Sequence, residues 1–265
     1  MGFSKSFAIR GGLDAWKQAG GLLEPLKKKM LFLDKTFTDP HENLAFDEAL
    51  LLQAELGQLD ECLRIWEIKE NTVVLGSGGI FHDDINEEEC LKSKVPILRR
   101  SSGGGTVLLG KGCLLFSLIL RTDTRPGLAT IKSSYVNIME QIAGSLGISG
   151  ITHDGTSDLA WDNKKFSGNA QQRKSLFILH HGSILYDFNI GMIPRYLKHP
   201  TRQPEYRLDR VHEQFLTNLP LDRTEIVSRL QDSWKARQTL EDLPIDTMKK
   251  LVQEKYLLDG WIRRR

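Results

Sequence analysis

The stretch Arg99-Arg100-Ser101-Ser102-Gly103-Gly104-Gly105-Thr106-Val107 leads two adjacent arginines directly into three glycines. Glycines let a backbone approach a bound group closely, and consecutive N–H groups can form a cradle for an anion. Each guanidinium adds charge-assisted donors suited to phosphate or carboxylate. Because neighbouring strand residues point to opposite sides, only one arginine can easily face such a site. The stretch predicts an anion-binding loop; a surface turn with solvated arginines is the alternative.

A lysine motif follows at Lys164-Lys165-Phe166-Ser167-Gly168-Asn169-Ala170-Gln171. Glycine beside a lysine on a strand marks a place where a ligand can come close to the backbone. There Lys165 would act as a point charge that stabilises an acyl-phosphate group and its leaving phosphate. A solvated surface lysine is the alternative, and we expect Lys164 to be one.

The third element is His180-His181-Gly182, on the strand after the lysine motif. Adjacent strand residues face opposite sides, so one histidine can line a site; a satisfied core histidine is the alternative. We expect no metal site here, because two adjacent histidines rarely bind one ion together and no carboxylate or cysteine cluster accompanies them.

These three elements, in this order, resemble the lipoate–protein ligase family, which shares its catalytic fold with biotin–protein ligases and octanoyltransferases. The chain matches the family's Arg-Arg-x-x-Gly-Gly-Gly-x-Val and Lys-x-Ser-Gly-x-Ala segments, and the resemblance runs from about Leu31 to about Leu219. It implies that Lys165 is the catalytic lysine and that Asp158 belongs to an Asn/Ser-Asp-Leu element near the ligand; turn capping is the alternative for Asp158. The implied binding residues are Arg99, Arg100, Ser102, Gly103, Gly104, Gly105, Asp158, Ser167, Gly168, Ala170, His181 and Gly182.

The resemblance also implies a reaction. ATP and lipoate would form lipoyl-adenylate, and the lipoyl group would pass to a lysine of a lipoyl-accepting protein domain, of the glycine-cleavage H type or from a 2-oxoacid dehydrogenase acyltransferase subunit. Mg²⁺ would accompany ATP without a dedicated protein metal site. An apolar tunnel would take the acyl chain, at roughly 0.8 kcal/mol for each buried CH₂.

Two departures from the family pattern keep other functions open. The family's triple glycine is commonly followed by Val-x-His-Asp, whereas Val107 precedes Leu108-Leu109-Gly110. After Leu219 the chain has only a helical stretch where the best-known ligases carry a further domain, and short members can need a separate accessory chain. The alternatives are an ATP-independent lipoyl or octanoyl transferase and a non-catalytic lipoate-binding protein.

The cysteines argue against the transferase. Octanoyltransferases form a thioester on a cysteine near the lysine motif, and Ile148 to Leu185 contains none. Cys62, Cys90 and Cys113 are widely separated, which excludes a CxxC pair and favours a reducing, cytoplasmic compartment. We expect all three to be buried, Cys113 within an apolar run.

Composition is that of an ordinary soluble protein. The 265 residues carry 36 basic and 34 acidic side chains, and this balance gives no support for nucleic-acid or membrane-surface binding. Arg202, Arg207 and Arg210 lie within nine residues, either on a loop that closes over phosphate or on a solvated helix face.

The order of predicted elements indicates an α+β domain on a mixed, mostly antiparallel sheet. We predict strands at 30–34, 63–67, 72–76, 96–100, 113–120, 159–161, 165–168 and 176–186, with 63–67 and 72–76 paired. Helices are predicted at 43–56, 84–92 and 131–146, a helical turn at 195–199, and two helices in 224–256 broken near Pro244. The expected division is a poorly ordered extension at 1–29, a catalytic domain at 30–219 and a helical segment at 220–265.

Overall fold

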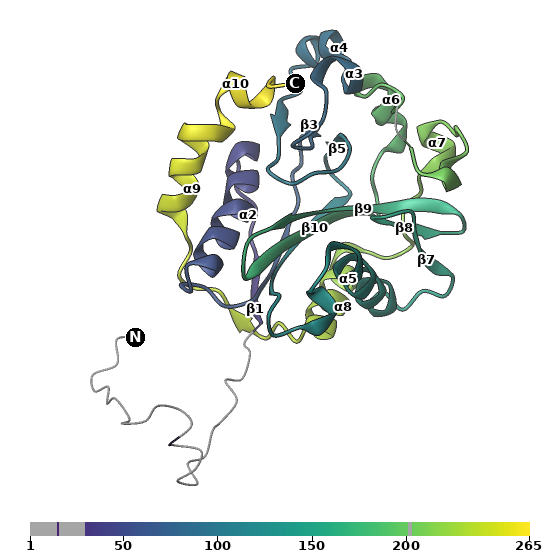
Figure 1. The fold of residues 1–265 in the computed structure, drawn as a ribbon. Helices are drawn as coiled ribbons and strands as arrows, with labels where there is room; N and C mark the ends of the chain where they lie inside the picture. The colour runs from purple at the N-terminus through teal and green to yellow at the C-terminus, as the bar shows by residue number, and fades with distance from the viewer. Residues whose placement is uncertain (1–14, 16–29, 201–202) are drawn as a thin grey trace.

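A computed structural model describes residues 15, 30–200 and 203–265 (Figure 1). The extension predicted at 1–29, Ala15 apart, and Arg202 therefore lie outside the described residues. The predicted fold class is confirmed: helices pack on a large, mostly antiparallel sheet of eight strands, in the order β11-β1-β2-β6-β10-β9-β8-β7. A second sheet has the order β4-β3-β5.

The large sheet is built around two long strands. Its members are β1 (Leu31–Asp34), β2 (Cys62–Trp66), β6 (Cys113–Arg121), β7 (Ile151–Asp154), β8 (Asp158–Trp161), β9 (Lys164–Arg173), β10 (Phe177–Leu185) and β11 (Gln238–Thr239). Only the β11–β1 and β1–β2 pairs are parallel. In β10, nine residues pair with β6 on one side, and on the other side the strand pairs with β9. This double pairing places the lysine motif directly beside the two histidines.

Helices cover both faces of the large sheet (Figure 1). One face carries α2 (Pro40–Glu55), which begins at the Asp39 cap, with α9 (Ile245–Leu251) packed against it. The other face carries α5 (Ile131–Ser145) and α8 (Arg223–Trp234), whose capping boxes satisfy their first backbone N–H groups. Two separate apolar clusters fill these layers, so the sheet has a core on each side.

The small sheet contains the glycine-rich loop. It consists of β3 (Thr72–Leu75), β4 (Ile97–Arg99) and β5 (Val107–Leu109), so the loop joins β4 to β5 on either side of β3. The predicted pairing of 63–67 with 72–76 is wrong. Strand β2 pairs with β1 and β6 and is buried along its whole length, and β3 pairs in the other sheet. A short polar turn suggests a hairpin, but distant strands compete for the same edges.

Short elements complete the fold. They are α3 (Phe81–Asp84), α4 (Glu87–Lys92), α6 (Ile193–Tyr196), α7 (His212–Phe215), α10 (Asp259–Ile262) and turns of 3₁₀ or π helix at 126–128, 190–192, 205–207 and 252–256. The helix predicted at 84–92 is found as α4 but begins later, at Glu87, because Ile85 and Asn86 have non-helical backbones that separate it from α3. Within the described ranges no helix combines the length and apolar character needed to cross a bilayer.

Candidate active site

Two adjoining cavities lie between the glycine-rich loop and the large sheet. The small cavity, about 140 Å³, is lined by seven bulky aliphatic or aromatic side chains, by the glycine loop and by β9 and β10. Those seven are Leu44, Trp66, Val74, Val107, Leu109, Leu115 and Phe116. The large cavity, about 970 Å³, continues past the same loop to the 203–216 segment. Residues shared by both walls are Gly104, Gly105, Thr106, Val107, Ser157, Asp158, Lys165, Gly168 and Ser183.

Lys165 lies at the start of β9, where the two cavities meet. Its Nζ is 2.8 Å from Asp158 Oδ1, and its side chain keeps 26% exposure. A Cβ added at Gly168 would lie 2.9 Å from this Nζ, so the glycine leaves room for the ammonium. Lys164, its neighbour, is exposed. The sequence motif thus supplies both the Lys165 ammonium and, through Gly168, the space that this ammonium occupies.

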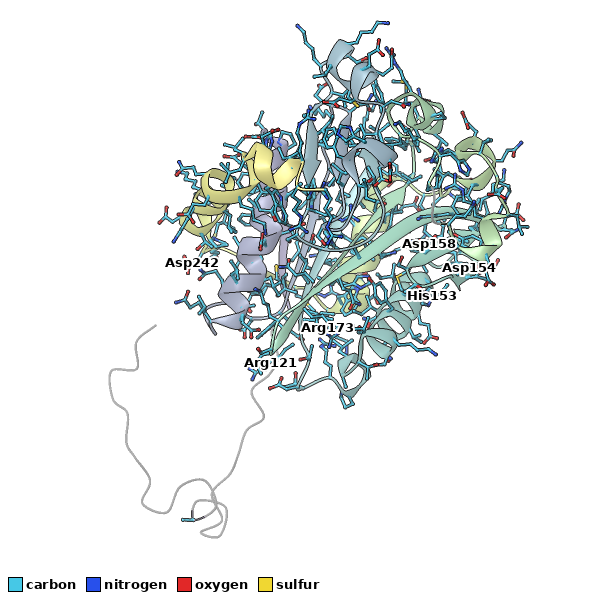
Figure 2. The ribbon with its side chains drawn as sticks, turned by 45° about the horizontal axis from the view of Figure 1, so that its top comes forward. Arg121, His153, Asp154, Asp158, Arg173 and Asp242 are labelled. Carbon is cyan, nitrogen blue, oxygen red and sulfur yellow. The ribbon has the colours of Figure 1, made fainter. Side chains whose placement is uncertain are left out.

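Asp158 is buried and holds two partners. Besides Lys165, it accepts a hydrogen bond of 3.0 Å from Tyr206 Oη to Oδ2. Burial and the neighbouring Asp158 charge raise the pKa of Tyr206, so its hydroxyl stays protonated and remains a donor. Figure 2 shows Asp158 far along the sheet from Arg121 and Arg173, which mark the opposite end of the long strands. The charged pair therefore belongs to one end of the sheet only.

The two predicted arginines have different surroundings. Arg100 lines the small cavity, and its guanidinium donates to the carbonyls of Val74, Gly103 and Gly105. Burial lowers the pKa of Arg100 to about 10, which leaves it charged at neutral pH. Arg99 is fully buried and lines neither cavity; it donates to backbone carbonyls behind the loop. The structure thus brings Arg100, and not Arg99, to the cavity.

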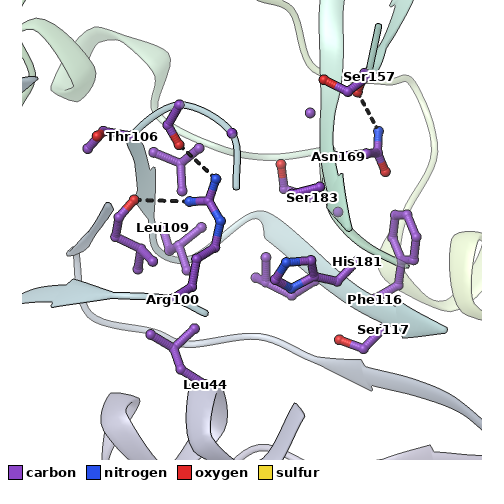
Figure 3. Close-up of a pocket in the computed structure, with 18 of the residues that line it drawn as sticks. Leu44, Arg100, Thr106, Leu109, Phe116, Ser117, Ser157, Asn169, His181 and Ser183 are labelled. Carbon is purple, nitrogen blue, oxygen red and sulfur yellow. Dashed lines mark hydrogen bonds between the residues drawn. The ribbon is translucent and has the colours of Figure 1, made fainter. Parts of the chain in front are cut away.

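The two histidines also separate. His181 lines the small cavity (Figure 3). Its Nε2 lies 2.5 Å from Ser102 Oγ. His180 is completely buried on the other face, 5.6 Å from the Tyr135 ring of α5. Its burial lowers its pKa to about 3, so His180 is neutral. Ser102 lines neither cavity; it joins the glycine loop to β10 through His181.

A buried polar network behind His181 was missed by sequence reasoning. Asp47 of α2 accepts from Arg64 Nη1 at 2.6 Å and from Ser117 Oγ at 2.7 Å, and its Oδ2 is 3.8 Å from His181 Nδ1. Burial alone would raise the pKa of Asp47, but the Arg64 charge and these hydrogen bonds hold it below its usual value. The sequence showed Asp47 only as a polar residue on a helix that is otherwise largely apolar.

The remaining predicted residues lie close together. Gly182 and Ala170 line the small cavity, Gly103 and Ser167 the large one, and Gly104, Gly105 and Gly168 both. A Cβ at Gly182 would lie 2.0 Å from Asn169 Oδ1, so any other residue would displace the Asn169 side chain. Asn169, not predicted as a site residue, lines the small cavity and donates from Nδ2 to the Ser157 carbonyl at 3.0 Å (Figure 3).

The predicted burial of the cysteines is confirmed. Cys62, Cys90 and Cys113 are all buried and free. Desolvation raises the thiol pKa to about 12 for Cys62 and Cys113 and to about 11 for Cys90. Cys113 contributes to the wall of the large cavity but stays protonated at neutral pH, and a thiol is a poor nucleophile.

Of the predicted arginine stretch, Arg207 is buried and contributes to the large cavity, while Arg210 donates to the Asn163 and Tyr206 carbonyls. Both guanidinium groups stack on Phe215. Neither lies on a solvated helix face. Among the residues that the structure describes, no three His, Cys, Asp or Glu side chains come together in a way that could hold a metal ion.

Residues 39–229 match the family model of the lipoyl protein ligase A/B catalytic domain. The chain belongs to this family. It is 28% identical to the probable lipoate-protein ligase A of Mycoplasma genitalium, over 82% of this chain and 57% of that protein. It is 26% identical to the octanoyltransferase LipM of Halalkalibacterium halodurans, over 87% of this chain and 97% of that protein. The chain thus spans about half the length of the ligases it matches first, and nearly all of this transferase.

Solved structures show the same fold. A bi-partite lipoate protein ligase of Thermoplasma acidophilum superimposes with a TM-score of 0.74 at 21% identity, covering 90% of this chain and 97% of that one. A lipoate-protein ligase A bound with ATP superimposes with a TM-score of 0.74 at 20% identity, covering 90% of this chain and 99% of the other. The relatives include both ligases and transferases, so the family leaves the reaction to be argued from the site.

Proposed function

We propose that the chain is an ATP-dependent lipoate–protein ligase, which forms lipoyl-adenylate and transfers the lipoyl group to a lysine of a lipoyl-accepting domain. The observation that carries this proposal is the Lys165–Asp158 pair at the junction of the two cavities, with all three thiols buried. A covalent transferase needs an accessible thiolate, and no cysteine here provides one.

In this proposal each cavity binds one of the two substrates. The small cavity, with its large apolar side chains, takes the acyl chain, and Arg100 and the loop amides face its carboxylate. The large cavity takes ATP, where Arg207 adds positive charge. The acid and the α-phosphate then meet beside Lys165, whose ammonium stabilises the negative charge that gathers on the transferring oxygens. Mg²⁺ would arrive with the triphosphate.

Bond changes follow in two steps. A lipoate carboxylate oxygen bonds to the α-phosphorus of ATP, and pyrophosphate leaves. The acceptor lysine amine then bonds to the acyl carbon, AMP leaves, and the amine gives up a proton. Asp158 is the carboxylate closest to this point and is suited to receive it.

The acceptors in this proposal are protein domains of the glycine-cleavage H type or from 2-oxoacid dehydrogenase acyltransferase subunits. A second chain is a further partner in this proposal, because the T. acidophilum ligase is bi-partite. The catalytic residues belong to 30–219, with 220–265 as a helical segment. Free thiols suit a reducing compartment, and we assign the reaction to the cytoplasm.

The test compares two substrates on the purified chain. We expect lipoylation of an acceptor domain from ATP plus lipoate, and from preformed lipoyl-adenylate without ATP. Transfer from adenylate alone would mean that activation needs an accessory chain, because aligning the α-phosphate requires closure over the nucleotide. Equal efficiency with both substrates would mean that no partner is needed. Failure with both would contradict the proposed function.

An octanoyltransferase is the second candidate, favoured by the near-complete coverage of LipM. Octanoyl transfer from an acyl carrier protein to an acceptor domain without ATP would support it. In that case intact-mass analysis should trap the acyl group on a cysteine. Transfer that requires ATP and leaves no adduct excludes it.

A further inference from the structure

Arg99, which the sequence suggested as an anion-binding residue, connects β4 to the last helix of the chain. Its Nε donates to the Ile262 carbonyl at 2.9 Å, and its Nη1 donates to the Gly76 and Gly79 carbonyls, both at 2.8 Å. In return, Trp261 Nε1 donates to the Arg99 carbonyl at 2.9 Å. Two reciprocal hydrogen bonds thus join the strand that leads into the glycine loop to α10.

Residues after α10 contact the turn that follows β3, which packs against the same loop. The Arg265 carbonyl accepts from Phe81 N at 2.9 Å, and Arg264 Nε donates to the Ser77 carbonyl at 3.1 Å. Ser77 N in turn donates to the Ser102 carbonyl at 2.7 Å. Arg265 also contributes to the wall of the large cavity. The segment therefore contacts both the strand that leads into the glycines and the turn that packs against them.

Close backbone packing transmits these contacts to the glycines themselves. A Cβ placed on Gly76 would lie 2.0 Å from the Gly104 carbonyl oxygen, so the Ser77 turn and the loop are in direct contact. Trp261 is itself held in place, with Lys255 Nζ and the Arg264 guanidinium each 4.3 Å from its ring. Lys255 is paired with Glu48 of α2 at 2.8 Å. The position of α10 is therefore fixed relative to the body of the protein.

We propose that residues 258–265 form a clamp, in which Trp261 and Arg99 are positioning residues that hold the glycine-rich loop in the shape that lines the cavities. Three consecutive glycines have more conformational freedom than any other sequence, and an unrestrained loop would have to be ordered whenever substrate binds. The clamp would hold the loop in this shape before substrate binds. Its structural part is independent of the reaction; its effect on catalysis rests on the proposed function.

Amide hydrogen exchange of the full chain without ligand tests the structural part. Trp261→Phe removes the indole N–H and keeps an aromatic ring. Trp234→Phe is the matched control, since Trp234 is buried in α8 and its N–H has no partner among the described residues. We expect peptides covering 99–106 to exchange at least about tenfold faster in Trp261→Phe only, with 164–185 unchanged in both. Unchanged exchange at 99–106, or equal acceleration in both variants, would overturn the clamp.

Steady-state kinetics test the positioning role. In Trp261→Phe, we expect the KM for lipoate or ATP to rise several-fold while the midpoint of thermal unfolding stays close to that of Trp234→Phe. Faster exchange with unchanged KM and kcat would contradict positioning. Arg99→Lys should act through the same contact, because one ammonium cannot replace a guanidinium that reaches three carbonyls, and adding Trp261→Phe should bring little further change. If exchange responds but wild type lacks lipoate-dependent activity, the proposed function fails and the structural clamp stands.

Discussion

The two faces of the large sheet differ although the same strands form both. On the α2 face, His181 lies in a cavity wall and is joined to Ser102, close to the carboxylate of Asp47. On the α5 face, His180 is sealed between Phe116 and Tyr135, and its Nε2 has no partner among the described residues. One step along the strand changes the surroundings from a polar, open site to a closed apolar layer.

We therefore expect residues on the α2 face to determine activity and residues on the α5 face to determine stability. Side chains on the α2 face, such as Lys165, remain partly exposed or are paired with an opposite charge. They bring charge to a cavity and pack less closely than core side chains. Groups on the α5 face contribute mainly to the core. Substitutions on the α2 face should therefore change the turnover rate more than the free energy of unfolding. Substitutions on the α5 face should change the free energy of unfolding more than the turnover rate.

The largest expected effect is on the α2 face. Lys165→Ala should lower lipoylation about a hundredfold or more, which corresponds to about 2.7 kcal/mol in the barrier, because the charge that stabilises the transferring oxygens is lost. The unfolding midpoint should change little. Lys164→Ala, at the exposed neighbour, is the control and should keep wild-type rates. More than about a tenth of wild-type activity in Lys165→Ala would contradict its role.

A closely packed glycine of β10 and an exposed glycine of α5 provide a second contrast. Gly182→Ala should destabilise the fold by about 1–3 kcal/mol and disturb the small cavity. The new Cβ would lie 2.0 Å from Asn169 Oδ1 and 2.9 Å from Phe116 Cζ. Gly144→Ala in α5 meets nothing within 4 Å and should stabilise by up to about 1 kcal/mol. Denaturant unfolding measures both changes. Equal stability of the two variants would disprove the claimed close packing around Gly182.

Acid stability reports on the α5 face. The folded state holds the pKa of His180 at about 3, below its ordinary value of 6.5, so the unfolded chain binds more protons between these limits. Stability should fall as the pH drops below about 6.5, and His180 should account for up to about 1.4 kcal/mol per pH unit. We expect His180→Leu to show a shallower decline between pH 7 and pH 5. An unchanged slope would mean that His180 titrates normally in the fold.

The smallest effect on activity is expected from the cysteines. Cys62→Ser, Cys90→Ser and Cys113→Ser should each keep activity within about threefold of wild type per folded molecule, although a buried hydroxyl can reduce the yield of folded protein. No acyl adduct should appear by intact mass. An acyl group trapped on any of these thiols would favour the transferase.

Local patterns predicted much of this arrangement, because they fix local geometry. The motif around Lys165 and the alternation at His180 and His181 were sufficient to place one lysine and one histidine beside the glycine loop. The helix predicted at 43–56 is found as α2, but it begins three residues earlier, at Pro40, after the Asp39 cap.

Long-range partners could not be predicted in the same way. Nothing in the pair Arg99-Arg100 says that the first guanidinium binds the Ile262 carbonyl, 163 residues away. The Arg64–Asp47 ion pair joins a strand to a helix, and the separation of β2 from β3 depends on strands β1 and β6. Each of these choices depends on the assembled sheets, which a single sequence does not reveal.

Lipoate-dependent exchange of labelled pyrophosphate into ATP tests the central claim most directly, because it reports adenylate formation without any acceptor protein. We predict exchange by the wild-type chain, alone or with an accessory chain, and its loss in Lys165→Ala but not in Lys164→Ala. Absence of exchange under both conditions, together with octanoyl transfer that needs no ATP, would contradict the ligase account.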